Sequence, residues 1–172
     1  MKYSLYLRIG LLLCVSYSCK EKHSKIYGVW YTVENFADFP YYFEAHITDS
    51  TFTVINQDGI SYISSYEING DTLKQYLKDL QNDNKVVDTV DFKLERKLDS
   101  FYMKNLYNPK ATSSWEKIEK VKPTDFSNFD ENEFSSKFRD RFISNYLTKT
   151  KNINTKILLQ NFDERWKIND KN

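Results

Sequence analysis

Cysteine and histidine, two residue types that often carry chemistry, are scarce in this 172-residue chain. Cysteine occurs only at Cys14 and Cys19, and histidine only at His23 and His46. His46 follows Glu44 by two positions, so on a strand their side chains share one face and could form an acid–base or metal-binding pair. A metal site normally needs three or four ligands, and Cys14, Cys19 and His23 all precede the predicted strands, so we do not expect them to complete one. We therefore interpret Glu44 and His46 as part of a solvent-facing polar stripe, and we expect no metal and no cofactor.

The sequence also lacks the motifs of common enzyme classes. It has no Gly-rich phosphate loop, no Gly-x-Ser-x-Gly nucleophile motif and no dinucleotide fingerprint. The paired acids of a glycoside hydrolase require a fixed separation across a cleft, which a sequence does not reveal. Lysine and arginine are interspersed with acids and the formal net charge is +1, so nothing indicates nucleic acid as a partner. We expect a non-catalytic protein.

Cys19 is the residue to which the sequence assigns a definite chemical role. It follows a positively charged start with Lys2 and Arg8, and then the apolar run 9–15. This arrangement is typical of a signal peptide. The apolar run is too short for a membrane-spanning helix, which takes roughly 20 residues.

Ser16-Tyr17-Ser18-Cys19 places a small residue directly before a cysteine and resembles the lipobox of bacterial lipoproteins. The resemblance implies cleavage before Cys19, a diacylglyceryl thioether on its sulfur and an acyl chain on its new amino group. Residues 1–18 would then be the signal peptide and residues 19–25 a lipidated cysteine with a polar tether. Two or more acyl chains anchor a protein stably to a membrane. Charged residues after the cysteine, and the lack of Asp at position 20, fit outer-membrane lipoproteins. A plain secretory signal and an uncleaved anchor are the alternatives.

Strand patterns dominate the stretch from Ile26 to Val121. Short runs of β-forming residues, separated by turn signals at intervals of about 8–12 residues, predict about seven or eight antiparallel strands. The segment 35–40 predicts a break after the first strand, and Asn69-Gly70-Asp71 predicts a tight hairpin turn. The next segment, 72–80, fits either a helical stripe or a continuing hairpin. The turn favours a strand over residues 72–76.

Sequential hairpins without long crossovers favour an up-and-down closed barrel, which leaves no exposed edge strand. Three segments resemble the lipocalin-like domains of small bacterial lipoproteins: Gly28-Val29-Trp30, the hairpin 69–73, and Ser114-Trp115-Glu116-Lys117-Ile118. We assign residues 26–122 to this barrel. The resemblance implies an interior that, in the wider superfamily, often holds an apolar ligand.

One strand, 41–48, shows which side chains would face that interior, because its large apolar residues alternate with polar ones. The residues expected to line a pocket or a packed core are Trp30, Tyr41, Phe43, Ile47 and Trp115. A packed interior is the alternative to a pocket, since an eight-stranded barrel is just wide enough for side chains to fill it.

The C-terminal extension, residues 123–172, changes to a helical period. Phe134, Phe138, Phe142 and Tyr146 form an apolar stripe, which predicts an amphipathic helix over about residues 131–148. Asp130 and Glu133 suit a capping box, and Phe129 with Phe134 suits a hydrophobic staple. We expect the stripe to pack on the barrel, with a partner-binding groove as the alternative. Residues 153–168 predict a second short helix or an extra hairpin.

Two functions are consistent with these patterns. The first is a lipid-anchored, lipocalin-like protein that binds a small apolar ligand or an envelope partner without catalysis. The second is an envelope interaction protein with a filled barrel: an accessory subunit, an inhibitor or an immunity protein. A third function, for which the only indication is aromatic residues near acids, is that of a carbohydrate-binding module.

Overall fold

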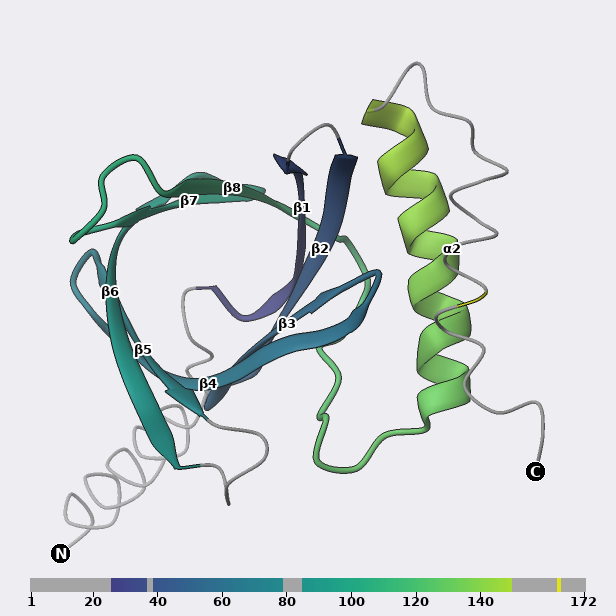
Figure 1. Cartoon of the computed structure of the whole chain (residues 1–172), viewed down its shortest axis with the longest axis horizontal. Coiled ribbons are helices and arrows are strands. Elements are labelled where there is room, and N and C mark those ends of the chain that lie inside the picture. The colour runs from purple at the N-terminus through teal and green to yellow at the C-terminus, as the bar shows by residue number, and fades with distance from the viewer. Residues whose placement is uncertain (1–25, 37–38, 79–84, 150–163, 165–172) are drawn as a thin grey trace, which may run out of the picture.

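The computed structural model of the chain describes residues 26–36, 39–78, 85–149 and Glu164. In it, antiparallel strands form a closed barrel, and a helix packs against the outside of the barrel (Figure 1). The predicted fold class is confirmed. The elements are β1 (Gly28–Phe36), β2 (Phe39–Ile47), β3 (Thr51–Asn56), β4 (Gly59–Asn69), β5 (Thr72–Lys78), β6 (Val86–Arg96), β7 (Ser100–Asn105), β8 (Thr112–Lys117) and α2 (Glu131–Lys149).

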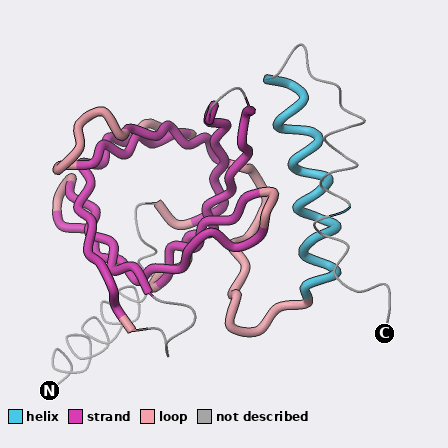
Figure 2. Tube along the Cα trace, viewed as in Figure 1, coloured by secondary structure: helices cyan, strands magenta, loops and turns pink. Residues whose placement is uncertain are grey.

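Every strand pairs with the next one along the chain, and β1 pairs with β8 to close the ring (Figure 2). This closing contact is short, with Trp30 opposite Lys117 and Tyr31 opposite Glu116. Two further hydrogen bonds strengthen it: Tyr31 Oη donates to Glu116 Oε2 at 2.6 Å, and the Ile118 amide donates to the Val29 carbonyl at 2.8 Å. Closure leaves no open sheet edge that could pair with another chain.

The hairpin turns set the register of the barrel. β4 and β5 are joined at Gly70-Asp71, where Gly70 has φ 63° and Asn69 pairs with Thr72. A glycine with positive φ at the first central position is the chemistry that a two-residue hairpin turn requires. The predicted turn is confirmed, and so is the strand after it, because β5 runs from Thr72 to Lys78.

The predicted break at residues 35–40 is wrong in its extent. β1 continues to Phe36 and β2 begins at Phe39, so the ladder includes Asn35 opposite Pro40 and Phe36 opposite Phe39. Proline lacks a backbone N–H and is tolerated near the beginning of a strand. Pro40 is the second residue of β2 and therefore does not interrupt the hairpin.

Alternation along the strands divides the buried side chains into two clusters. The interior cluster fills part of the barrel, whereas the outer cluster lies between α2 and the outer face of β1–β3. The buried members of the interior cluster are Ile26, Trp30, Ala45, Ile47, Phe52, Val54, Leu73, Leu94, Phe101, Met103 and Trp115. Those of the outer cluster are Tyr42, Ile55, Phe134, Phe138, Phe142 and Tyr146.

α2 begins as its sequence predicts. Asp130 Oδ1 accepts a hydrogen bond from the Glu133 amide at 2.9 Å, which satisfies one of the free N–H groups of the first turn. The rings of Phe129 and Phe134 meet edge to face at 5.7 Å, which is the contact of a hydrophobic staple. The predicted N-cap and staple are confirmed, as is the packing of the aromatic stripe on the barrel. Glu133 does not complete the predicted capping box, because among the described residues its carboxylate pairs with Lys137.

Several predictions fall outside the described residues. The signal peptide (1–18), Cys19 and the tether (19–25) lie there, as does the second helix or hairpin predicted over residues 153–168, apart from Glu164. No helix in the described part of the chain is long and apolar enough to cross a bilayer.

Candidate functional site

Glu44 and His46 are the pair of side chains that the sequence singles out for chemistry. They do share a face of β2, but they are 0 % and 1 % exposed, so the prediction of a solvent-facing stripe is wrong. The outer cluster packs over this face, and the rings of Phe126 and Phe134 contact His46 at 5.3 and 5.5 Å. Alternation shows which residues share a face, but it does not show what covers that face.

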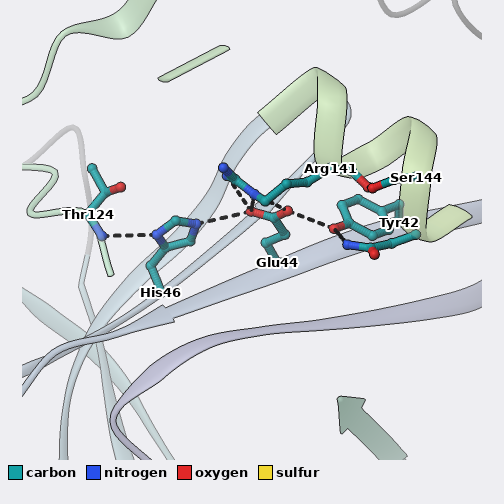
Figure 3. Close-up of polar contacts among 7 residues, drawn as sticks. Tyr42, Glu44, His46, Thr124, Arg141 and Ser144 are labelled. Atoms are coloured by element: carbon teal, nitrogen blue, oxygen red, sulfur yellow. Dashed lines mark hydrogen bonds and ion pairs between the residues drawn. The ribbon is translucent and has the colours of Figure 1, made fainter. Parts of the chain in front are cut away.

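The Glu44 carboxylate is the centre of a buried polar network (Figure 3). Arg141, from α2, donates from Nε to Oε1 at 2.9 Å and from Nη2 to Oε2 at 2.8 Å. Tyr42 Oη donates to Oε1 at 2.7 Å, and His46 Nε2 lies 3.1 Å from Oε2. Two oxygens with about four lone-pair sites therefore meet four donors.

The hydrogen bonds of His46 fix its tautomer. The backbone N–H of Thr124 donates to Nδ1 at 3.0 Å, so Nδ1 carries no proton. The proton of a neutral ring then sits on Nε2 and is donated to Glu44. Burial lowers the pKa of His46 and outweighs the opposing effect of Glu44. His46 is therefore neutral, and both of its nitrogens are in use.

Charge in this network resides on Glu44 and Arg141. Burial alone would raise the pKa of Glu44, but hydrogen bonds from His46 and Arg141, with the charge of Arg141, bring it below its usual value. Burial also acts against the Arg141 charge, yet Glu44 raises the net pKa of Arg141. A forked guanidinium–carboxylate pair is the strongest form of protein ion pair.

Asn145 extends the network along α2. Its Nδ2 donates to Tyr42 Oη at 3.1 Å, and the Tyr42 ring packs against Phe138 and Phe142 at 5.8 and 5.6 Å. We call Tyr42, Glu44, His46, Thr124, Arg141 and Asn145 the helix clamp. The carboxylate and imidazole atoms of the clamp are all engaged, so the clamp fastens α2 to the barrel and leaves none of these atoms available for acid–base chemistry or metal binding.

The barrel interior is a second candidate site, and its two ends differ. The β2–β3, β4–β5 and β6–β7 turns lie at one end, which we call the β2–β3 end. Here Trp30, Phe101 and Trp115 pack together, with ring centroids 4.8 Å apart for Trp30–Phe101 and 6.1 Å apart for Phe101–Trp115. Trp30 Nε1 donates to the Ile26 carbonyl at 2.8 Å. Ile47 and Phe52 are fully buried beside these rings, so this end is a packed core.

The predicted lining residues are thereby divided between two environments. Trp30, Ile47 and Trp115 belong to the packed core at the β2–β3 end. Tyr41 and Phe43 lie nearer the other end, the β1–β2 end, where their rings stack with centroids 6.2 Å apart. Both are only half-buried, although Phe43 packs against the interior cluster.

Three polar residues share the interior with Tyr41 and Phe43. Register places Glu34 opposite Tyr41, and Tyr62 opposite Val54 of the interior cluster. Gln75 lies in the middle of β5, between the inward positions of Leu73 and Leu77. We call Glu34, Tyr41, Phe43, Tyr62 and Gln75 the polar half of the interior.

The polar groups of this half are incompletely satisfied. Gln75 is 1 % exposed, and its Nε2 has no hydrogen-bond partner within the part of the chain that the structure describes. Glu34 is half-buried, and no hydrogen bond or ion pair joins its carboxylate to another described residue. Burial raises the pKa of Glu34. Burial is also the main cause that raises the pKa of Tyr62. The side chain of Gln75 lies near the Tyr62 hydroxyl and lowers that pKa, and the charge of Glu34 raises it.

Sequence reasoning missed Glu34, Tyr62 and Gln75 as site residues. A usable signal was present: Gln75 interrupts an apolar alternation with Leu73 and Leu77, and Glu34 shares a strand face with Trp30. A polar residue on an otherwise apolar interior face requires a partner. The sequence does not show whether that partner is protein, water or ligand.

Metal binding finds no support at these places. No group of three or more His, Cys, Asp or Glu side chains within residues 26–36, 39–78 and 85–149 is arranged to hold a metal ion. Comparison with known proteins returns no match: no protein-family model, no curated protein sequence and no solved structure is similar enough to this chain to establish a relationship.

Proposed function

We propose that this chain is a lipid-anchored envelope protein with a lipocalin-like barrel that takes a small ligand into the polar half of its interior. One observation carries the proposal: the interior is filled unequally. At the β2–β3 end Ile47, Phe52 and Phe101 are fully buried, whereas Tyr41 and Phe43 at the other end retain exposed surface. Half-exposed aromatic side chains on the inner face of a closed barrel are surface that a ligand can cover.

The unpaired amide of Gln75 supports the same proposal. A buried donor without a partner costs about 1–3 kcal/mol of stability. Leu73 and Leu77 occupy the neighbouring inward positions of β5, so an apolar side chain is compatible with this face of the strand. A polar group that the fold does not use is explained if a bound molecule uses it.

An uncharged apolar dye tests the barrel proposal. N-phenyl-1-naphthylamine fluoresces more strongly in apolar surroundings, and we expect saturable binding to the wild-type protein. Val90→Trp would fill the interior, because Val90 lies opposite Gln75, and it should abolish this binding. Val87→Trp is the matched control, since Val87 is 61 % exposed on the same strand. Absence of saturable binding, or equal binding by both variants, would contradict the proposal.

The anchor belongs to the proposal as well, and it rests on the likeness of residues 16–19 to a lipobox. We expect the native protein to incorporate labelled fatty acid and to fractionate with the outer membrane. Cys19→Ala should abolish labelling and release the protein into the soluble fraction. If the variant is still labelled, Cys19 is not the attachment site.

An envelope interaction protein is a second candidate, favoured by apolar side chains on the face of the barrel away from α2. Val87, Tyr102, Leu106 and Tyr107 of this face are 61, 40, 48 and 77 % exposed. They come from β6, β7 and the loop after β7, and a contiguous apolar patch there would mark a protein contact. Cross-linking in intact cells should join this face to one partner, and Val87→Ser should weaken that cross-link. Cross-links spread evenly over the barrel would count against this function.

A further inference from the structure

Glu34 places a carboxylate in the polar half of the interior. It is the second residue before the end of β1 at Phe36, and it lies opposite Tyr41, so its side chain is on the inner face near the β1–β2 end. Asp88, which is exposed, is at a register position on the same side of its strand near this end, opposite Leu77. No lysine or arginine occupies an inward position of this half among the described residues. An anionic ligand would therefore meet carboxylates without a counter-charge.

Aromatic rings accompany the Glu34 carboxylate. The stacked rings of Tyr41 and Phe43 lie on the same inner face, and Tyr62 packs against the interior cluster from β4. The face of an aromatic ring attracts a cation, and the attraction grows when water is excluded. A carboxylate among aromatic rings is thus a chemical environment suited to an organic ammonium group.

Gln75 adds a second requirement. Its Nε2 is a buried donor that needs an acceptor, which an ammonium group does not provide. A ligand that satisfies both residues has a cationic nitrogen and a nearby oxygen. Phe43 and Phe92, which pack against the interior cluster, would contact the apolar part of such a ligand.

We infer that the ligand of the barrel is a small amphipathic organic cation, whose ammonium group is held by Glu34 and the aromatic rings and whose oxygen accepts from Gln75 Nε2. This inference rests on the proposed function, and it excludes fatty acids and other apolar anions as the preferred ligands. Recognition involves only non-covalent contacts. The apolar core at the β2–β3 end closes the barrel beneath the ligand.

Three probes of similar size test the charge preference by displacing N-phenyl-1-naphthylamine. They are phenylalaninol, which is a cation with a hydroxyl group, 3-phenylpropan-1-ol, which is neutral, and 3-phenylpropionate, which is an anion. We expect phenylalaninol to bind about tenfold more tightly than the neutral alcohol, from the carboxylate and ring contacts together. The anion should bind most weakly.

Glu34→Gln should reduce the preference for the cation to about threefold or less, with each probe measured against the affinity of that variant for the dye. Asp99→Asn is the control, because Asp99 is exposed at the opposite end of the barrel and should leave the preference unchanged. Equal or tighter binding of the anion, or an undiminished preference in Glu34→Gln, would overturn the inference. Such a result with dye binding intact leaves the barrel proposal standing, whereas failure of the dye to bind the wild type would refute that proposal itself.

Discussion

Two clusters of polar side chains lie on opposite faces of the barrel wall in the described part of the chain. The helix clamp lies outside the barrel, where Glu44 meets donors from Tyr42, His46 and Arg141. The polar half lies inside, where Glu34 has no ion pair with a described residue and Gln75 has an unpaired amide. The barrel wall therefore carries a satisfied polar cluster on its outer face and an incompletely satisfied one on its inner face.

The difference in hydrogen-bond satisfaction indicates a structural role for the helix clamp and a binding role for the polar half. A buried ion pair is held in place when additional hydrogen bonds occupy its remaining donors and acceptors. The clamp meets this condition and fastens α2 to β2. The polar half does not meet it, and unsatisfied groups of this kind lower stability unless something binds them. Substitutions in the two clusters should consequently have opposite effects.

The largest effect is expected at the centre of the clamp. Glu44→Leu leaves Arg141 charged and buried without its partner, which should lower the free energy of unfolding by about 3–5 kcal/mol. Urea unfolding followed by circular dichroism measures it. Glu133→Gln is the control, since the exposed Glu133–Lys137 pair should contribute less than about 1 kcal/mol.

If Glu44→Leu does not fold, its free energy of unfolding is not measurable. The double variant Glu44→Leu/Arg141→Leu then tests the same prediction. Removing both charges should recover much of the lost stability, because replacement of a buried ion pair by apolar residues is often tolerated. A double variant as unstable as the single one would show that the clamp does not act as a charge pair.

A smaller effect is expected from acid. Burial lowers the pKa of His46 below its usual 6.5, so the unfolded chain takes up a proton at a higher pH than the folded chain. The contribution of His46 to stability is thus complete above about pH 6.5 and declines as the pH falls further. The charged neighbours of His46 in the clamp are Glu44 and Arg141.

Glu44 adds to this decline only at lower pH. Its pKa is depressed, so its contribution is present above about 4.5 and is lost as the pH falls through its folded value. Between pH 6.5 and 5, Glu34, whose pKa is raised, contributes a slope of the opposite sign, so His46 is isolated by comparing the slope of unfolding free energy against pH in the wild type and in a His46 variant. His46→Gln should flatten that slope, and an unchanged slope would mean that the titrating group lies elsewhere.

The smallest effect concerns the start of α2. Asp130→Ala removes the acceptor of the Glu133 amide and should lower stability by about 1 kcal/mol. Asp125→Ala is a comparison variant, because Asp125 accepts from Ser127 in an exposed turn before the helix. Asp130→Asn should retain most of the stability, since asparagine is also a good cap. Equal losses from the alanine and asparagine variants would contradict a capping role.

Local patterns made the barrel and the beginning of α2 predictable. The Gly70 turn and the Asp130 cap depend on neighbouring residues, and alternation within each strand distinguishes its two faces. The clamp was not predictable in this way, because Glu44 and Arg141 are 97 positions apart and become neighbours only when α2 packs on the barrel. For the same reason Glu44 and His46 were assigned to solvent.

The interior was predictable in part. Trp30, Phe43 and Trp115 were expected on the inner face, and the structure places them there, but their sequence pattern did not reveal that one end is packed and the other half-exposed. That difference depends on the register between strands, which determines which side chains meet at each end of the barrel. Gln75 could have been recognised from the sequence, because it is a polar residue on an apolar strand face. Glu34 could have been recognised in the same way on β1.

The most direct test compares two amides, one in each cluster. Asn145→Leu removes the donor to Tyr42 Oη in the clamp and should lower the free energy of unfolding by about 1 kcal/mol. Gln75→Leu removes the unpaired amide of the interior and should raise it by about 1–2 kcal/mol in the ligand-free protein. Urea unfolding of both variants beside the wild type gives the two values. Opposite signs are the predicted result, and a Gln75→Leu variant that is less stable than the wild type by more than about 1 kcal/mol would contradict the account.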